Sequence, residues 1–412
     1  MTMTTTTDDV ALIVTGPHGF SGAQQIMSGI IYELSREGLC VHYIGFERPF
    51  RFRTNDADQI AFHTVKDISS GAIGDLKPIK SSDVLAVFTI AEQMTDLAIK
   101  LHSTGSRLIL WGVYMFPYGH AAWLSKRTLT EMGLPADLWL TPAGSDMWEI
   151  GPQVRNTTKG ILGSSEVSVL ITYTRQFADE ITTMYELNRP FVTAYPILDF
   201  SRFHAASAAE RAQARKVLQV RESELLISSH SNMRPVKMPE AVIDIAAAVA
   251  ERTDRQITLA MVGPKIAFPT RKRSRNFRLI QTGVVDRVEE VLRAADVELN
   301  CSFHDSFNLS LAEAMACGVP CVSTDVVGIG QEILASECGL LFSCVRSSDG
   351  KNRCSFDFES AVNCVLTLVN SERLRRRMSK NASAHARRVF HRDSVISSYC
   401  EIIHNTEARE EC

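Results

Sequence analysis

The sequence predicts an α/β fold made of two Rossmann-like halves, each with a parallel sheet. Three observations carry this prediction. Short apolar runs alternate with segments long enough for crossover helices, the alternation breaks at a proline within residues 194–203, and it then restarts with a second set of strands. Two halves of similar size imply a ligand-binding cleft between them.

The first half opens with a β-loop-α-β unit. Residues 10–14 are an apolar strand candidate that leads into the segment GPHGFSG, and apolar residues at helical spacing follow as far as Leu34. Gly38 ends that helix, and residues 39–44 are expected to form the next strand. Four further buried strands are expected in this half: residues 84–88, 107–111, 137–141 and 168–172.

The second half repeats the alternation of strands and helices around a helix at residues 239–251. Its expected strands are residues 225–229, 257–262, 278–280, 297–300 and 320–323. Two polar stretches interrupt the order: residues 265–278, with six basic residues, and the serine-rich residues 344–356. Both are predicted to be surface loops. The alternative for the basic stretch, a nucleic-acid site, lacks the interleaved aromatic residues that stack on bases.

The composition excludes several classes of protein. The chain has 412 residues, 45% hydrophobic and 22% charged, which argues against a disordered or fibrous protein. Lys and Arg number 44 and Asp and Glu number 47, so the net charge of −3 does not favour a nucleic-acid partner or a membrane surface. No apolar run reaches the roughly 20 residues of a membrane span, and residues 1–9 lack the pattern of a secretory signal. A cytoplasmic metabolic enzyme is expected.

The cysteines and acidic residues leave two alternatives to weigh. Nine of the ten cysteines lie between Cys301 and Cys412, none forms a CxxC pair, and several fall in apolar segments, so reduced thiols are preferred over disulfides. Asp56-Ala57-Asp58 spells DxD, a metal-sugar motif, but it lies in a polar loop, and a solvated loop is the preferred interpretation. With no cluster at metal-ligand spacing elsewhere, neither a metal nor a cofactor is predicted.

Residues 301–322, CSFHDSFNLSLAEAMACGVPCV, carry the most informative pattern. Asp305 precedes a turn, a helix is expected to start near Asn308, and Glu313 lies about one and a half turns inside it. The helix N-terminal amides at Ser306, Phe307, Asn308 and Leu309 would attract a diphosphate, and Glu313 could accept hydrogen bonds from ribose hydroxyls. The alternative is an amphipathic helix whose acidic residue is merely solvated.

This segment resembles the ESFG-type signature of retaining glycosyltransferases of family 4, which have the GT-B fold. That signature has two glutamates separated by seven residues and a tail like EAMACGVPV. Asp305 and Glu313 have this spacing, and residues 313–320 keep the tail. The chain departs from the signature at Asp305, where the family has glutamate, and at Asn308, where it usually has glycine.

Further matches run along nearly the whole chain. Residues 231–237, SNMRPVK, resemble the SNFRPVK stretch of the bacillithiol-pathway N-acetylglucosaminyl malate synthases, and the next residues are similar to the mycothiol-pathway relatives. The resemblance implies that Arg234 and Lys237 face the donor diphosphate and act in catalysis with Asp305. Gly19, Ser21 and Gly22 resemble the glycine-rich donor loop, and Gly283 begins a segment near the base site; these four residues are assigned to donor binding.

The resemblance assigns the acceptor to the first half. Tyr114, Tyr118, His120, Ser145 and Asp146 are the candidates by position, although packing roles would explain the aromatic residues equally well. The family histidine that is often assigned to the donor sugar is replaced by Ala143. The chemistry would survive this loss if the leaving phosphate takes the acceptor proton.

The sequence therefore predicts a metal-independent retaining GT-B glycosyltransferase. It would move a sugar from a UDP-sugar or GDP-sugar to a small soluble acceptor such as a thiol, a thione or an aminocyclitol. Lincosamide and aminoglycoside pathways contain relatives of this branch. The expected domains are residues 1–197 for the acceptor, residues 198–385 for the donor, and a helix at residues 386–412 that returns to the first domain. A homodimer would suit the branch. The alternatives are a catalytically impaired nucleotide-sugar-binding relative and another two-Rossmann enzyme, although the GxGxxG fingerprint of NAD enzymes is absent.

Overall fold

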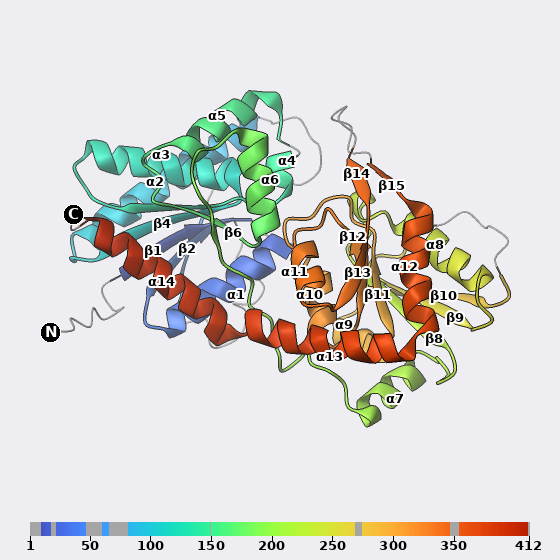
Figure 1. Cartoon of the computed structure of the whole chain (residues 1–412). Helices are drawn as coiled ribbons and strands as arrows, with labels where there is room; N and C mark the ends of the chain where they lie inside the picture. Colours follow the sequence, from blue (N-terminus) through green and yellow to red (C-terminus); the bar gives the residue numbers. More distant parts are fainter. Residues whose placement is uncertain are drawn as a thin grey trace. The chain divides into compact units, whose positions relative to one another are not determined.

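The computed structural model describes residues 10–17, 22–46, 60–65, 81–148, 150–267, 274–346 and 354–410. The chain divides into two compact units (Figure 1). Unit 1 comprises Met1–Ile197 and Arg392–Cys412, and unit 2 comprises Leu198–His391. Each unit has a parallel sheet with helices on both faces, so the predicted fold class is confirmed.

The sheet of unit 1 has seven strands in the described residues, in the order β3-β2-β1-β4-β5-β6-β7. All its strands are parallel to their neighbours. The chain thus runs outward from β1 in one direction and then restarts on the other side of it, which is the doubly wound arrangement. The strands are β1 (Val10–Thr15), β2 (Cys40–Gly45), β3 (Ile60–Thr64), β4 (Arg107–Val113), β5 (Asp137–Thr141), β6 (Val169–Thr172) and β7 (Val192–Thr193).

Successive side chains along the strands of unit 1 point to opposite faces of the sheet, and both faces are apolar. Ala11 and Ile13 of β1 belong to a core that includes Ile90 and Met94 of α2, whereas Trp111 of β4 contacts Tyr399 of α14 on the opposite face. Because both faces are covered, the strands read as continuous apolar runs. In the described residues, the helices of unit 1 are α1 (Gly22–Arg36), α2 (Ser81–His102), η4 (Met115–Gly119), α3 (His120–Glu131), α4 (Ser145–Trp148), α5 (Pro152–Gly163), α6 (Arg175–Tyr185) and α14 (Arg392–Glu410).

The expected strand at residues 84–88 is wrong, because these residues lie in the first turns of α2. Val84, Leu85 and Phe88 are exposed, while Ala86, Ile90 and the later core residues of α2 recur at helical spacing. In the sequence, a run of apolar residues at the start of a helix therefore has the same pattern as a buried strand. The strands β3 and β7 were not predicted.

The sheet of unit 2 has six strands in the described residues, in the order β10-β9-β8-β11-β12-β13. All are parallel to their neighbours. Each predicted strand of this half overlaps an observed one, and β13 was not predicted. The strands are β8 (Leu225–His230), β9 (Ile257–Val262), β10 (Phe277–Gly283), β11 (Val297–Asn300), β12 (Cys321–Thr324) and β13 (Gly339–Phe342).

Helices cover both faces of this second sheet (Figure 1). On one face Leu225 and Ile227 of β8 pack in a core with Val242 of α8 and Val365 of α12. The intervening residues of the strands face the other side, where α9 and α10 lie. The helices of unit 2 are α7 (Ala208–Val217), η5 (Pro235–Lys237), α8 (Pro239–Glu251), α9 (Val288–Ala294), α10 (Leu309–Ala316), α11 (Gly330–Ala335), α12 (Phe358–Asn370) and α13 (Glu372–Val389).

Two further segments differ from expectation. The stretch predicted as a surface loop at residues 344–356 contains an antiparallel ribbon of β14 (Cys344–Arg346) and β15 (Cys354–Phe356). The expected helix at residues 386–412 is the end of α13 followed by α14, and the two helices are separated at residues 390–391. The backbone N–H of Leu198 donates to the carbonyl of Phe390 (3.0 Å), so the two ends of unit 2 lie side by side.

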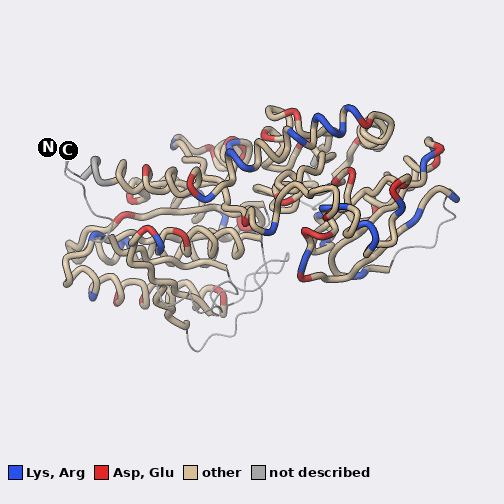
Figure 2. The backbone as a smooth tube through the Cα atoms, turned by 90° about the horizontal axis from the view of Figure 1, so that it is seen from below, with Lys and Arg blue, Asp and Glu red and all other residues tan. Residues whose placement is uncertain are grey.

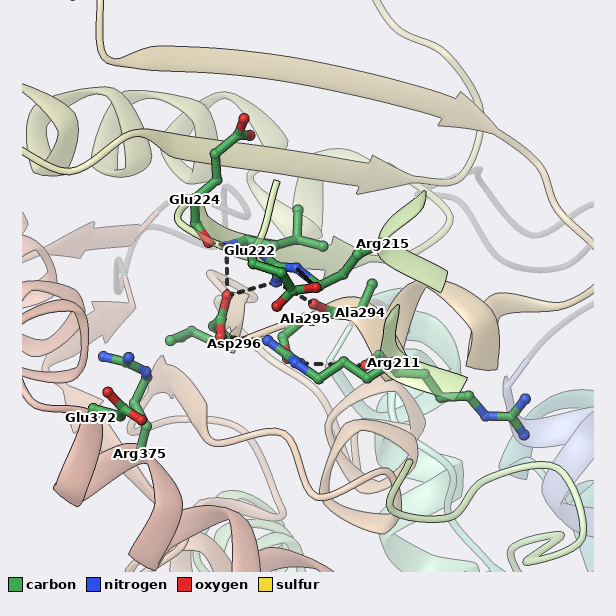
Figure 3. Close-up of polar contacts among 12 residues, drawn as sticks. Arg211, Arg215, Glu222, Glu224, Ala294, Ala295, Asp296, Glu372 and Arg375 are labelled. Atoms are coloured by element: carbon green, nitrogen blue, oxygen red, sulfur yellow. Dashed lines mark hydrogen bonds and ion pairs between the residues drawn. The ribbon is translucent and has the colours of Figure 1, made fainter. Parts of the chain in front are cut away.

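A buried arginine ties α7 to the sheet of unit 2 (Figure 3). Arg215 is 1% exposed, pairs with Asp296 (Nη1 to Oδ2, 3.2 Å) and donates to the carbonyl of Ala294 (3.0 Å). Asp296 also accepts from Arg211 (2.7 Å) and from the backbone N–H of Leu226 (2.8 Å). This arrangement satisfies the buried charges and has a structural role.

Within the described residues, charged side chains do not gather into one large region of a single sign. Figure 2 shows Lys and Arg interspersed with Asp and Glu along both units. In the part of the chain that the structure describes, we find no helix whose length and apolar character would let it cross a membrane.

Candidate functional site

The start of α10 is shaped by two predicted site residues, Asp305 and Asn308. Asn308 precedes the helix in a left-handed conformation (φ 77°), and its Oδ1 accepts from the backbone N–H of Leu311 (3.2 Å). Asp305 Oδ1 in turn accepts from the backbone N–H of Asn308 (3.1 Å). Asn308 thereby supplies an N-cap at a position where the positive φ otherwise favours glycine.

A polar donor at this helix start lacks an acceptor. Asn308 is 2% exposed, and its Nδ2 has no hydrogen-bond partner among the described residues. A buried amide donor without an acceptor is costly, and an anion placed at the helix start would satisfy it. Of the neighbouring predicted residues, Phe307 packs against Phe390 (5.5 Å between ring centroids), and Ser306 is buried.

Lys237 is brought to the same place by the short helix η5. Its Nζ forms an ion pair with Asp305 Oδ2, and the two side chains are only 15% and 20% exposed. Arg234 lies just before η5, where its backbone carbonyl accepts from the N–H of Lys237 (2.8 Å). Three predicted residues, Lys237, Asp305 and Asn308, are therefore joined by direct contacts, although they come from segments about 70 residues apart in sequence.

Glu313 belongs to a second network, which contains two residues that the sequence did not indicate. Its Oε2 lies 3.0 Å from Nε2 of His230, and Nδ1 of His230 lies 2.9 Å from Oε1 of Glu298. Burial alone would lower the pKa of His230, but the carboxylates of Glu298 and Glu313 outweigh it and raise the pKa to about 10. The histidine therefore carries a positive charge at neutral pH.

The sequence did contain a signal for this network. Glu298 lies within the predicted strand at residues 297–300, and a carboxylate in a buried strand needs a partner. The partner could not be identified from the sequence, because His230 is 68 residues away and is brought close only by the pairing of β8 with β11.

The glycine positions divide into described and undescribed ones. Gly19 and Ser21 lie outside the described residues, as does the DxD at residues 56–58. Gly22 is the first residue of α1, and Gly283 ends β10 with φ 79°. Gly283 also accepts at its carbonyl from the N–H of Gly263 (3.1 Å).

Gly263, which was not predicted, sets the path of the loop before Arg234. Its φ is 143°, and a Cβ at this position would lie 2.0 Å from the carbonyl oxygen of Ser231. A side chain is therefore excluded where the residues 231–237 pass the end of β9. This close approach fixes the backbone that leads into η5.

One of the predicted acceptor residues, Asp146, is a buried carboxylate in unit 1. Asp146 accepts from the backbone N–H of Met115 (2.6 Å) and from that of Ala143 (3.1 and 3.2 Å). Burial raises the pKa of Asp146 to about 6, although these backbone bonds act in the opposite direction. Asp146 thus holds two loops together.

The other acceptor candidates have different surroundings. Tyr114 Oη and Ser145 Oγ form a hydrogen bond (2.7 Å) and are less enclosed than Asp146. His120 Nε2 lies 2.9 Å from Thr158 Oγ1, and burial lowers its pKa to about 4, so it is neutral at pH 7. Tyr118 is 2% exposed. Ser145 is half-buried, whereas Tyr114, Tyr118, His120 and Asp146 are buried.

The described residues contain no group of three or more His, Cys, Asp or Glu side chains that could hold a metal ion. The chemistry that the described groups supply is that of anion binding: a lysine paired with an aspartate, a helix start with an unsatisfied amide, and a carboxylate held by a charged histidine. These groups lie at the carboxyl ends of parallel strands, where α/β folds bind ligands.

Comparison with known proteins bears on the same region. Residues 224–349 match the family described as Glycosyl transferases group 1. The chain is also 25% identical, over 373 residues that cover 89% of each chain, to N-acetyl-alpha-D-glucosaminyl L-malate synthase of Bacillus anthracis. The chain is a GT-B glycosyltransferase. Lys237, Asp305, Asn308, Glu313 and His230 all fall within the matched segment of this glycosyltransferase.

The chain is also similar to a second curated protein and, in its fold, to solved structures. D-inositol 3-phosphate glycosyltransferase of Saccharomonospora viridis is 26% identical over 256 residues, which cover 58% of this chain and 56% of that protein. A glycosyltransferase from Rickettsia africae has a similar structure, with a TM-score of 0.71, 12% identity and coverage of 97% of this chain and 99% of that one. Anabaena HepE, solved in complex with UDP and glucose, has a TM-score of 0.66, 14% identity and coverage of 96% and 100%.

Proposed function

We propose that this glycosyltransferase moves a sugar from a UDP-sugar or GDP-sugar to a small soluble acceptor, with retention of the anomeric configuration and without a metal. The observation that carries the proposal is the junction of Lys237, Asp305 and Asn308 at the start of α10. It combines a cation, a carboxylate and an unsatisfied amide donor in one place. In a nucleoside diphosphate sugar, the diphosphate can be bound by the cation and the amide donor, and the sugar hydroxyls can donate to the carboxylate.

In this proposal the diphosphate lies against the helix start. Lys237 and Arg234 neutralise the charge that develops on the leaving diphosphate, and Asn308 Nδ2 donates to a phosphate oxygen. Glu313 accepts from the ribose hydroxyls. Asp305 lies beside Lys237, where a sugar attached to the diphosphate would meet it; its side chain is one methylene shorter than the glutamate of the family signature.

The proposed step exchanges one bond at the anomeric carbon. The bond from this carbon to the diphosphate oxygen breaks, and a bond from the acceptor nucleophile forms on the same face of the sugar. The acceptor proton passes to the leaving phosphate oxygen, so that no protein base is required. This route is compatible with Ala143 at the position where the family has histidine.

Only the names of relatives indicate which class of acceptor this chain would use. The names of two relatives indicate malate and inositol phosphate as acceptors in those proteins. We therefore propose a small polar acceptor for this chain, with Tyr114 and Ser145 as contact residues. A thiol, thione or aminocyclitol of antibiotic biosynthesis is within this class, and a homodimer remains part of the proposal.

A sugar-transfer assay with the purified chain tests the proposal. The chain is incubated with UDP- and GDP-sugars and a panel of small hydroxy acids, cyclitols and thiols, and the product anomer is determined by NMR. Retention of configuration is expected. Lys237→Ala should lower the rate at least tenfold, since one hydrogen bond to a charged group contributes about 1.5–3 kcal/mol.

Lys380→Ala, which changes an exposed lysine on α13, is the matched control and should leave the rate unchanged. Inversion of configuration would contradict the retaining mechanism. Nucleotide-sugar binding without transfer to any acceptor would instead favour the second candidate, a catalytically impaired relative. That candidate is motivated by Asp305, Asn308 and Ala143, which depart from the family signature.

A further inference from the structure

A chain of charged groups crosses unit 2 from the middle of the sheet to α10. It runs from Glu298 on β11 through His230 at the end of β8 to Glu313 on α10. Glu298 is fully buried, the side chain of His230 is 8% exposed, and that of Glu313 is 14% exposed. The exposed fraction of the side chains thus increases from Glu298 through His230 to Glu313, toward the helix that carries the proposed donor site.

The inner end of this chain is fixed by several hydrogen bonds. Glu298 Oε1 accepts from the backbone N–H of His230 (3.1 Å) as well as from its ring, and Glu298 Oε2 accepts from the hydroxyl of Ser228. The pairing of Ser228 with Glu298 between β8 and β11 sets this alignment. Glu298 therefore has little freedom to move, and it holds the imidazole in one orientation.

The ring nitrogens of His230 must both donate. Each nitrogen faces a carboxylate oxygen, and an ionised carboxylate can only accept a hydrogen bond. The imidazole is thus an imidazolium, and its Nε2–H is directed at Glu313 Oε2. Of the two oxygens of Glu313, Oε2 is taken by this contact, and Oε1 is the one that would accept from a ribose.

We propose that His230, oriented by Glu298, is a positioning residue that aligns the carboxylate of Glu313 for the ribose hydroxyls of the nucleotide. This inference rests on the proposed function, in which Glu313 contacts the ribose. His230 does not touch the nucleotide itself. Its loss leaves Glu313 in place but free to rotate, so that binding of the ribose weakens and binding of the diphosphate does not.

The test compares ligands that differ only in the ribose. The dissociation constants of UDP, GDP, their 2′,3′-dideoxy analogues and inorganic pyrophosphate are measured by calorimetry with the full chain. For the nucleotide that binds more tightly, the wild-type protein should prefer the ribose form over the dideoxy form by about 10- to 100-fold, since hydrogen bonds to a charged group are lost in the latter. Glu313→Ala should abolish this preference.

Three variants separate positioning from general structural effects. His230→Phe should reduce the preference to less than about threefold, with pyrophosphate binding unchanged. His230→Gln, which keeps one donor, should give an intermediate preference, and it serves if the Phe variant does not fold. His385→Phe is the matched control, because His385 is another buried histidine of unit 2 that pairs with a glutamate (Glu332, 2.8 Å). It should retain the wild-type preference.

The outcomes separate the two proposals. A wild-type preference that persists in both His230 variants would overturn the inference and leave the proposed function standing. An equal loss of pyrophosphate and nucleotide binding in His230→Phe, repeated in His230→Gln, would also overturn it, because the role would then be structural. A wild-type protein that binds neither nucleotide, or a Glu313→Ala variant that keeps the preference, would refute the proposed function of Glu313 instead.

Discussion

Removal of the Asp296 carboxylate should destabilise unit 2 strongly. Asp296 pairs with Arg211 and Arg215 and accepts from the backbone of Leu226, and Arg215 is 1% exposed (Figure 3). Asp296→Ala leaves the buried guanidinium of Arg215 with only the exposed carboxylate of Glu222, 3.7 Å away, as an ion-pair partner. Breaking a buried ion pair in this way typically costs about 3–5 kcal/mol. With a urea dependence of about 2 kcal/mol per molar, the midpoint of unit 2 should fall by about 2 M.

The assay can assign the loss to one unit. All four tryptophans lie in unit 1, so tryptophan fluorescence monitors that unit, whereas circular dichroism monitors both units. Urea unfolding followed by both signals should show the early transition of Asp296→Ala in circular dichroism. Glu359→Ala is the control: it breaks the exposed pair with Arg252 and should cost less than about 1 kcal/mol. A circular dichroism curve equal to that of the wild type would refute the structural role of Asp296.

Three further predictions concern single positions. His120 has a folded-state pKa of about 4, below its ordinary value of 6.5, so it lowers stability as the pH falls through this range, by up to about 3 kcal/mol. His120→Gln should lose less stability than the wild type between pH 7 and pH 4 in fluorescence-monitored urea unfolding, and equal losses would contradict this. Gly263→Ala should lower the thermal midpoint and weaken nucleotide binding, because its Cβ would collide with Ser231, whereas Gly160→Ala in an open helical position should not. Asn308→Gly should lower the free energy of unfolding by only a few tenths of a kcal/mol. Asn308→Ala lacks both the cap and the freedom to adopt φ 77°, so it should lower the free energy of unfolding by about 1–2 kcal/mol more, as measured by scanning calorimetry. Equal losses in the two variants would show that the conformation is not strained.

The sequence was most informative where the pattern is local. Residues 137–141 and 257–262 were predicted as strands with the bounds of β5 and β9, because strands buried on both faces read as short apolar runs. Residues 84–88 show the limit of this rule, since an apolar helix start gives the same signal. Residues 344–356 were predicted as a loop because a short polar ribbon has no apolar alternation.

The sequence also indicated those parts of the candidate site that lie close together along the chain. Asp305, Asn308 and Glu313 lie within one helix start, so their spacing could be read from the sequence. The family resemblance assigned Lys237 and Asp305 to the same donor site but did not predict their ion pair, and His230 was missed entirely. Contacts between residues 68 or more apart depend on strand pairing, which periodicity alone does not specify.

Thermal unfolding with a panel of nucleotides tests the central claim most directly. The full chain is heated with UDP, GDP, ADP, dTDP or NAD at millimolar concentration. A ligand at 100 times its dissociation constant adds about 2.7 kcal/mol, which corresponds to a rise of about 5–10 °C in the midpoint for a unit of this size. We expect such a rise with UDP or GDP and its loss in Glu313→Ala. No rise with any diphosphate, or a rise with NAD alone, would contradict the proposed donor site.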